Sequence, residues 1–139
     1  MRYFSQKHRD WANMTLGELP NNTMKSIGCY VTSICMLVER SPDLVLPVLN
    51  EAECFTDEGA LLNEKAAQVL DMVYSKVFEN PHKRCICETN YYAKLGYPQH
   101  FFVWLNQGQF ICDPLDGIIK INKYSIVSYR LWDKRSRWI

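Results

Sequence analysis

Long apolar segments are missing from this sequence. None of its 139 residues falls in an apolar run near the roughly 20 residues that a membrane-spanning helix needs. Residues 1–11 also lack the apolar centre of a secretory signal peptide. We therefore expect a soluble protein that is cytoplasmic as synthesised and acts elsewhere only if it is released.

The sequence also has no excess of charge of either sign. It carries 16 Lys and Arg against 15 Asp and Glu, which gives a formal net charge of +1, and it has no run of like charges. Obligate nucleic-acid binders and polybasic membrane binders depend on a strongly basic surface. We therefore expect neither nucleic acid nor membrane as a partner.

Internal repeats and low-complexity segments are absent as well. The composition, 47% hydrophobic with 13% aromatic residues, excludes intrinsic disorder. A fold of this length buries roughly 70% of the surface that its unfolded chain exposes, and its size is that of one domain. We expect residues 1–139 to form a single domain with a substantial core.

The six cysteines lack the C-x-x-C spacing that is typical of metal and redox sites. In a reducing compartment their default state is the free thiol. Cys85 and Cys87 would share one face of a strand close to His82, which leaves a zinc-binding interaction protein as a minor alternative. Because no second pair of ligands is evident, we expect ordinary strand cysteines and no bound metal.

The first half of the chain reads as helical. Residues 1–26 are polar and turn-rich and predict an irregular arm anchored by Trp11. Residues 29–39 are apolar on nearly every side of a helix, which is the pattern of a buried helix. A short helix is expected over 43–52, and apolar residues at helical spacing predict another of about three turns over 61–73.

The second half reads as strands. Apolar alternation and turn residues predict strands over 84–89, 100–105, 109–113, 118–121 and 126–132. Helices followed by antiparallel strands are the α+β pattern, in which the buried helix packs against the sheet.

Cys29 stands out among the cysteines because of its place in the buried helix. It follows Gly28 in the first turn, with Ser26 or Thr23 available to cap the start. A thiolate at that point faces unpaired backbone N–H groups and the positive end of the helix dipole. These surroundings favour a nucleophile, whereas Cys35, inside the helix, reads as a small buried residue.

His100 and Asp113 fall on two strands that form a predicted hairpin. With the turn at 106–107, His100 faces Asp113 directly; with the turn at 107–108, Asp113 faces Phe102, diagonal to His100. Either register places the imidazole and the carboxylate on one face. Asp113 can then hold one ring nitrogen and leave the other for a thiol, which is the logic of a catalytic triad.

Several short motifs in this order resemble the papain-like cysteine peptidases, and most closely the bacteriocin-leader-peptidase-like branch. The matching segments are Gln6-x-x-x-Asp10-Trp11, Leu16-Gly17, Ile27-Gly28-Cys29-x-x-Thr32-Ser33-x-x-Met36, His100-Phe101-Phe102-Val103 and Asp113-Pro114-Leu115-Asp116-Gly117. The resemblance covers roughly residues 3–132. It implies a papain-like fold with N-terminal helices packed on an antiparallel β-sheet.

The resemblance also implies roles for individual residues. Cys29 would be the nucleophile, His100 the general base and then acid, and Asp113 the residue that orients His100. Gln6 would donate to the oxyanion together with the backbone N–H of Cys29, although 23 positions separate the two residues. Such a donor typically contributes about 10² to 10³ in rate.

The same resemblance implies a peptide or protein substrate, such as a cell-wall peptide or a protein leader, cleaved by a bacterial or phage hydrolase without metal or organic cofactor. Trp11, Tyr30 and Tyr91 are candidate substrate contacts, and Tyr30 stands where a small residue is common in the family. The alternative is a catalytically inactive papain-like binding or structural module.

Overall fold

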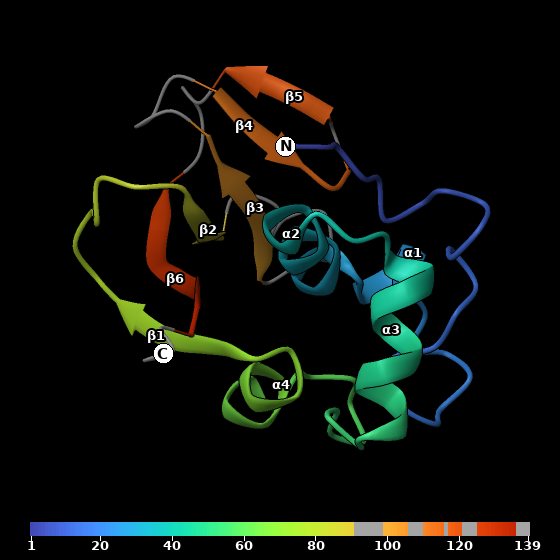
Figure 1. The fold of residues 1–139 in the computed structure, drawn as a ribbon. Helices are drawn as coiled ribbons and strands as arrows, with labels where there is room; N and C mark the ends of the chain where they lie inside the picture. Colours follow the sequence, from blue (N-terminus) through green and yellow to red (C-terminus); the bar gives the residue numbers. More distant parts are fainter. Residues whose placement is uncertain (91–98, 106–109, 116, 121–124, 136–139) are drawn as a thin grey trace.

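The computed structural model describes residues 1–90, 99–105, 110–115, 117–120 and 125–135 (Figure 1). The helices come first, and the strands follow. Their bounds are α1 (Met24–Ile27), α2 (Cys29–Val38), α3 (Pro42–Glu51), α4 (Asn63–Val69), β1 (Met72–Val77), β2 (Cys85–Thr89), β3 (His100–Trp104), β4 (Phe110–Asp113), β5 (Gly117–Lys120) and β6 (Ile126–Lys134). Within the described part of the chain, no helix has the length and apolar character to cross a membrane.

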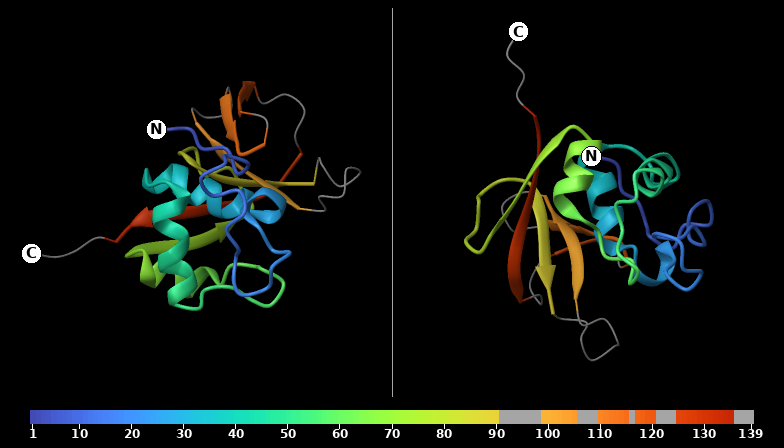
Figure 2. Two further views of the ribbon diagram at one scale, coloured as in Figure 1. Left: turned by 90° about the vertical axis from the view of Figure 1, so that its right-hand side faces the viewer. Right: turned by 90° about the horizontal axis from the view of Figure 1, so that it is seen from below.

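The strands of the described residues form one six-stranded sheet in the order β1-β6-β2-β3-β4-β5. Every neighbouring pair in it is antiparallel. The helices gather on one side of this sheet, as the right-hand view of Figure 2 shows. The expected α+β class, with helices packed on an antiparallel sheet, is confirmed.

Helix α2 is the buried helix that the sequence predicts. Its residues Val31, Ile34, Cys35 and Met36 are at most 1% exposed, and they pack in the core between the sheet and the other helices. Its main contact with the sheet is β3. The first residue of the helix, Cys29, is therefore placed directly against the strand that begins with His100.

Gly28 separates α1 from α2. A Cβ atom at this position would lie 2.4 Å from the backbone oxygen of Met24, so only glycine allows the chain to pass this closely. Thr23 occupies the N-cap of α1, without a side-chain capping bond, and Gly28 occupies the N-cap of α2. The expectation that Ser26 or Thr23 caps the buried helix is therefore wrong.

The helix expected over 61–73 is shorter than its apolar spacing suggests. Helix α4 ends at Val69, and Asp71, with a φ of 57°, turns the chain into strand β1. Val73 is half exposed and lies opposite Asp133 in the β1–β6 ladder. Pairing with a strand some 60 residues away overrides the local periodicity.

Strand β3 is buried on both faces. Phe101 and Val103 pack in the core that contains α2, whereas Phe102 and Trp104 pack with Cys85 and other residues on the opposite face. All five residues of the strand are buried. His100 is thus carried by a strand whose position is fixed from both sides.

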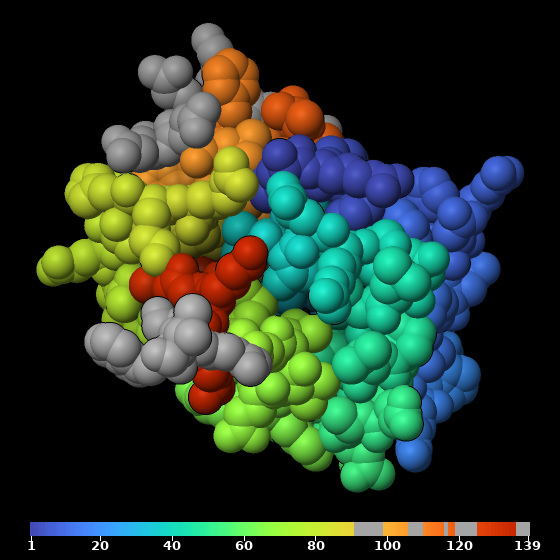
Figure 3. Space-filling model, viewed as in Figure 1, coloured from blue at the N-terminus to red at the C-terminus, as the bar shows by residue number. Residues whose placement is uncertain are grey.

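The N-terminal arm is irregular, as predicted, but Trp11 is not its only anchor. Phe4, Gln6, Trp11 and Leu16 are all at most 6% exposed. The beginning of the arm, dark blue in Figure 3, lies between the orange β4–β5 hairpin and the cyan end of α2. It therefore contacts both the helical layer and the sheet.

Candidate active site

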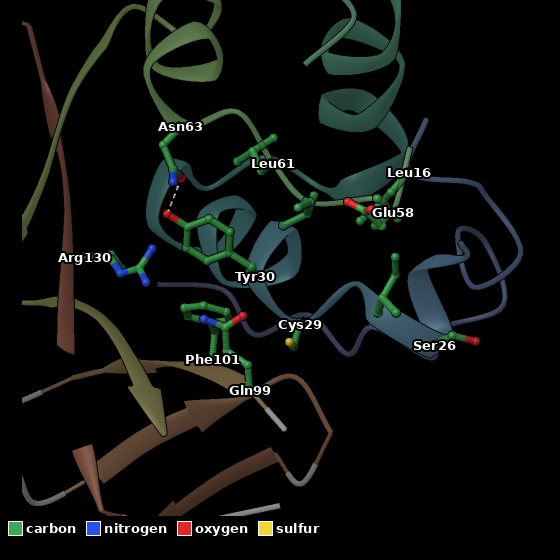
Figure 4. Close-up of a pocket in the computed structure, with 14 residues that line it drawn as sticks. Leu16, Ser26, Cys29, Tyr30, Glu58, Leu61, Asn63, Gln99, Phe101 and Arg130 are labelled. Carbon is green, nitrogen blue, oxygen red and sulfur yellow. Dashed lines mark hydrogen bonds between the residues drawn. The ribbon is translucent and has the colours of Figure 1, made fainter. Parts of the chain in front are cut away.

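Cys29 lines a pocket of about 440 Å³. In Figure 4 its sulfur points out from the start of α2, beside Gln99 and Phe101. All six cysteines are in the described part of the chain, and Cys29 alone among them lines this pocket. It is also the most accessible of the six, 8% exposed against at most 2% for the others.

His100 and Asp113 form a buried pair beside the pocket. The β3–β4 ladder pairs Val103 with Cys112 and Trp104 with Ile111. Extended by one residue, this register sets Asp113 opposite Phe102, the second of the two arrangements that the sequence allows. Nε2 of His100 and Oδ1 of Asp113 are 2.8 Å apart, and both side chains are fully buried.

The imidazole ring interacts with Cys29 as well as with Asp113. Burial by itself lowers the pKa of His100, but the hydrogen bond to Asp113 and the hydrogen-bonding contact and charge of Cys29 raise it to about 9. The ring therefore holds its proton at neutral pH. The structure brings the thiol, the imidazole and the carboxylate together in the order that the sequence analysis expects.

The carboxylate of Asp113 is held in place from its own turn. Oδ1 accepts a second hydrogen bond, from the backbone N–H of Leu115 at 2.8 Å. This is an Asx turn, which ends strand β4 and fixes the orientation of the carboxylate at the same time. Asp113 Oδ1 thus takes part in the turn and in the hydrogen bond with His100 at the same time.

Gln6 is fully buried next to the helix that precedes Cys29. Its amide Nε2 donates to the backbone oxygens of Met24 at 3.2 Å and Lys25 at 3.1 Å. An amide nitrogen carries two hydrogens. Gln6 would have to release one of these carbonyls to donate to an oxyanion, so that role stays a prediction.

The candidate substrate contacts have different positions. Tyr30 lines the pocket, donates to Asn63 Oδ1 at 2.6 Å and accepts from Trp132 Nε1 at 3.1 Å. Burial raises the pKa of Tyr30, so its hydroxyl stays neutral. Trp11 does not line this pocket; it packs against Phe4, and its Nε1 donates to the backbone of the arm. Tyr91 lies outside the described residues.

Sequence reasoning missed a second polar pair at the wall of the pocket. Arg130 lines the pocket and pairs with Glu88 at 2.9 Å. Burial alone raises the pKa of Glu88, but hydrogen bonds from Ser128, Gln99 and Arg130 lower it overall. Gln99 directly precedes His100 in the sequence. The signal that could have revealed the Arg130–Glu88 pair is the charged Arg130 within a mostly apolar predicted strand.

The described residues do not support the alternative of a zinc site at Cys85, Cys87 and His82. Cys85 and Cys87 are fully buried in β2, and burial raises the pKa of Cys87 with a further contribution from its neighbour Cys85. Within the described ranges, no group of three or more His, Cys, Asp or Glu side chains is arranged to hold a metal ion.

Comparisons with protein-family models, with curated proteins and with solved structures find no match to this chain. The function therefore has to be inferred from the geometry of the chain's own side chains. The most informative part of that geometry is the interaction of Cys29, which lines the pocket, with the buried His100–Asp113 pair beside it.

Proposed function

We propose that this protein is a cysteine peptidase or a related amidohydrolase with a papain-like fold. The observation that carries the proposal is a single buried imidazole that bonds Asp113 through Nε2 and also contacts the thiol of Cys29. A nucleophile, a base and an orienting group within reach of one another are the requirements of covalent amide hydrolysis.

The first half of the reaction cleaves the amide. The Cys29 sulfur attacks the carbonyl carbon, a C–S bond forms, and the carbonyl oxygen takes the electron pair. As the C–N bond breaks, the His100 imidazolium gives its proton to the departing nitrogen. The products of this half are a free amine and a thioester on Cys29.

The second half releases the acid. Neutral His100 removes a proton from water, and the resulting hydroxide attacks the thioester carbon. When the C–S bond breaks, the sulfur leaves as a thiolate and the thiolate–imidazolium pair is restored. Asp113 keeps the ring oriented through both halves and stabilises its charged form.

The developing oxyanion needs hydrogen-bond donors. The backbone N–H of Cys29, at the start of α2, is one candidate because the first N–H groups of a helix lack partners within it. Gln6 is the second, on condition that its amide exchanges the oxygen of Met24 or Lys25 for the oxyanion.

The pocket favours a peptide-like substrate with an apolar side chain. Six apolar residues contribute to its lining: Leu16, Ile27, Val31, Ala60, Leu61 and Phe101. Polar groups stand at its ends, Arg130 on one side of Cys29 and Glu58 on the other, as Figure 4 shows. An extended peptide lying across Cys29 would bury a side chain among the apolar residues and leave its ends near the polar ones.

Selective alkylation tests the proposal. Substoichiometric iodoacetamide near pH 6 should modify Cys29 in preference to the other five cysteines, because only a thiol paired with an imidazolium reacts rapidly at that pH. The modified residue is identified by peptide mass spectrometry. In His100→Ala the preference for Cys29 should disappear.

A matched histidine substitution provides the control. His82 is exposed and does not line the pocket, and asparagine tolerates its φ of 53°, so His82→Asn should leave the labelling of Cys29 unchanged. Slow and uniform labelling of all six cysteines in the unsubstituted protein would contradict the proposed chemistry. It would favour the inactive binding module instead.

A further inference from the structure

Residues 3–6, here called the N-terminal segment, contact the turn that follows Asp113. The hydroxyl of Tyr3 donates to the backbone oxygen of Asp113 at 2.7 Å. The backbone N–H of Gln6 donates to the backbone oxygen of the next residue, Pro114, at 3.0 Å. Two successive carbonyl groups next to the triad carboxylate are therefore held by the beginning of the chain.

The position of Asp113 makes these bonds significant. The β3–β4 ladder pairs Val103 with Cys112, the residue directly before Asp113. On its other side Asp113 pairs with Gly117 across the turn to β5. The Tyr3 hydroxyl adds a hydrogen bond to the backbone of the residue that carries the carboxylate, at the end of β4.

The N-terminal segment also reaches the helical layer that carries Cys29. Phe4 is 3% exposed in the core, and the Gln6 amide donates to Met24 and Lys25 of α1, which directly precedes Cys29 through Gly28. The segment therefore connects the nucleophile's helix to the turn that carries Asp113.

A second connection joins the helix of Cys29 to the strand of His100. Tyr30 follows Cys29 in the sequence, and Phe101 follows His100. The ring centroids of Tyr30 and Phe101 lie 4.4 Å apart. The nucleophile and the base are thus held by neighbouring aromatic rings. The carboxylate lies one strand farther from α2 and gains its additional support from the N-terminal segment.

We propose that Tyr3 is a positioning residue of the triad, which fixes the backbone of Asp113 so that its carboxylate orients His100. This inference rests on the proposed function for its catalytic meaning. The geometry of the His100–Asp113 pair, however, can be measured without any substrate.

Tyr3→Phe is the test because it keeps the ring and removes only the hydroxyl. One buried hydrogen bond typically changes an equilibrium about threefold to tenfold. We expect the His100 pKa, measured by NMR on protein with labelled histidine, to fall by about half a unit to one unit. The alkylation rate of Cys29 at pH 6 should fall by about threefold to tenfold.

Two control variants separate positioning from general loss of stability. Tyr129→Phe removes the hydroxyl of a partly buried tyrosine on β6, and Val45→Ala leaves a small cavity at a buried position of α3. Neither residue lines the pocket. Both variants should keep the wild-type His100 pKa and the wild-type alkylation rate, even where the melting temperature falls.

The outcomes distinguish this inference from the proposed function. An unchanged His100 pKa and alkylation rate in Tyr3→Phe would overturn the positioning role, as would equal shifts in Val45→Ala. If Cys29 shows no selective alkylation in the wild type while the His100 pKa still falls in Tyr3→Phe, the peptidase proposal fails. The role of Tyr3 in holding the His100–Asp113 pair would then stand.

Discussion

Two pairs of opposite charge, one fully buried and one largely buried, lie in neighbouring parts of the sheet, and they resemble each other in geometry. His100 and Asp113 are 2.8 Å apart with both side chains fully buried, and Arg130 and Glu88 are 2.9 Å apart with side chains 8% and 12% exposed. The first pair joins β3 to β4, and the second joins β6 to β2. Distance and burial alone do not tell them apart.

The surroundings of the two pairs differ. His100 interacts with the thiol of Cys29 in addition to its hydrogen bond with the carboxylate of Asp113. Arg130 instead donates to the hydroxyls of Ser128 and Tyr74, and its guanidinium lies over the rings of Tyr30 and Phe101.

The chemistry of the cations decides what each pair can do. An imidazolium releases its proton within an accessible pH range, whereas a guanidinium does not. The first pair is therefore suited to moving a proton to and from a nucleophile. The second is suited to holding the wall of the pocket, and removing one partner from such a pair mainly costs stability.

Removing the carboxylate from each pair in turn should give the largest contrast. In Asp113→Ala the imidazole loses its orienting group, and we expect hydrolysis of a quenched-fluorescence peptide library to fall by about 10³-fold. In Glu88→Ala we expect a loss of about 3 kcal/mol in the free energy of unfolding, because Arg130 is left unpaired. Its activity at a temperature where it stays folded should change less than about fivefold. Urea unfolding and initial rates provide the two measurements.

Equal losses of activity in the two variants would mean that both pairs serve the same purpose, which would contradict the distinction between them. Glu88→Gln is the matched control for the second pair. It keeps an oxygen that accepts from Ser128 and Arg130, so it should recover most of the stability lost in Glu88→Ala.

The pH dependence of stability should also separate the pairs. The pKa of His100 is raised in the folded state from its ordinary 6.5 to about 9. The folded protein therefore binds a proton more tightly than the unfolded chain, and the resulting stabilisation is complete below about pH 6.5 and lost as the pH rises through 9. We expect a decrease on the order of 2 kcal/mol in the unfolding free energy over this interval.

Urea unfolding at several pH values between 6 and 9.5 measures this decrease. His100→Gln removes the titrating ring, so its stability should change much less over the same interval. The cysteines of this variant remain the same, which controls for their titration. A wild-type stability that stays constant or rises between pH 6.5 and 9 would contradict the raised pKa of His100.

The difference between the two pairs also explains what the sequence could predict. His100 and Asp113 lie 13 residues apart on a hairpin, and the parity of a short turn is enough to set them on one face. Glu88 and Arg130 lie 42 residues apart, on strands that are adjacent only because β6 inserts between β1 and β2. Local patterns carry no information on such an insertion.

The same lack of local information accounts for the other differences between the predicted and the observed structure. The apolar spacing at the start of strand β1 is typical of a helix. The segment forms a strand because it pairs with β6, which begins more than 50 residues later. The bonds of Gln6 to Met24 and Lys25 depend on how an irregular arm folds back, which periodicity does not address. The buried helix with Cys29 at its start needed only local apolarity, and it was predicted correctly.

Tyr30 lies between the two pairs and should show the smallest effect. It follows Cys29, its ring packs on Phe101, and Arg130 lies over it at 5.8 Å.

Tyr30→Phe keeps these ring contacts and removes the hydrogen bonds with Asn63 and Trp132. Because these bonds shape the pocket and not the reacting atoms, we expect KM to rise about twofold to fivefold with kcat nearly unchanged. Steady-state kinetics on the best library peptide, with Tyr129→Phe as the matched control, measure both constants. A tenfold fall in kcat at constant KM would instead assign Tyr30 to the chemical step, and the separation between the reacting pair and the pocket wall would no longer hold.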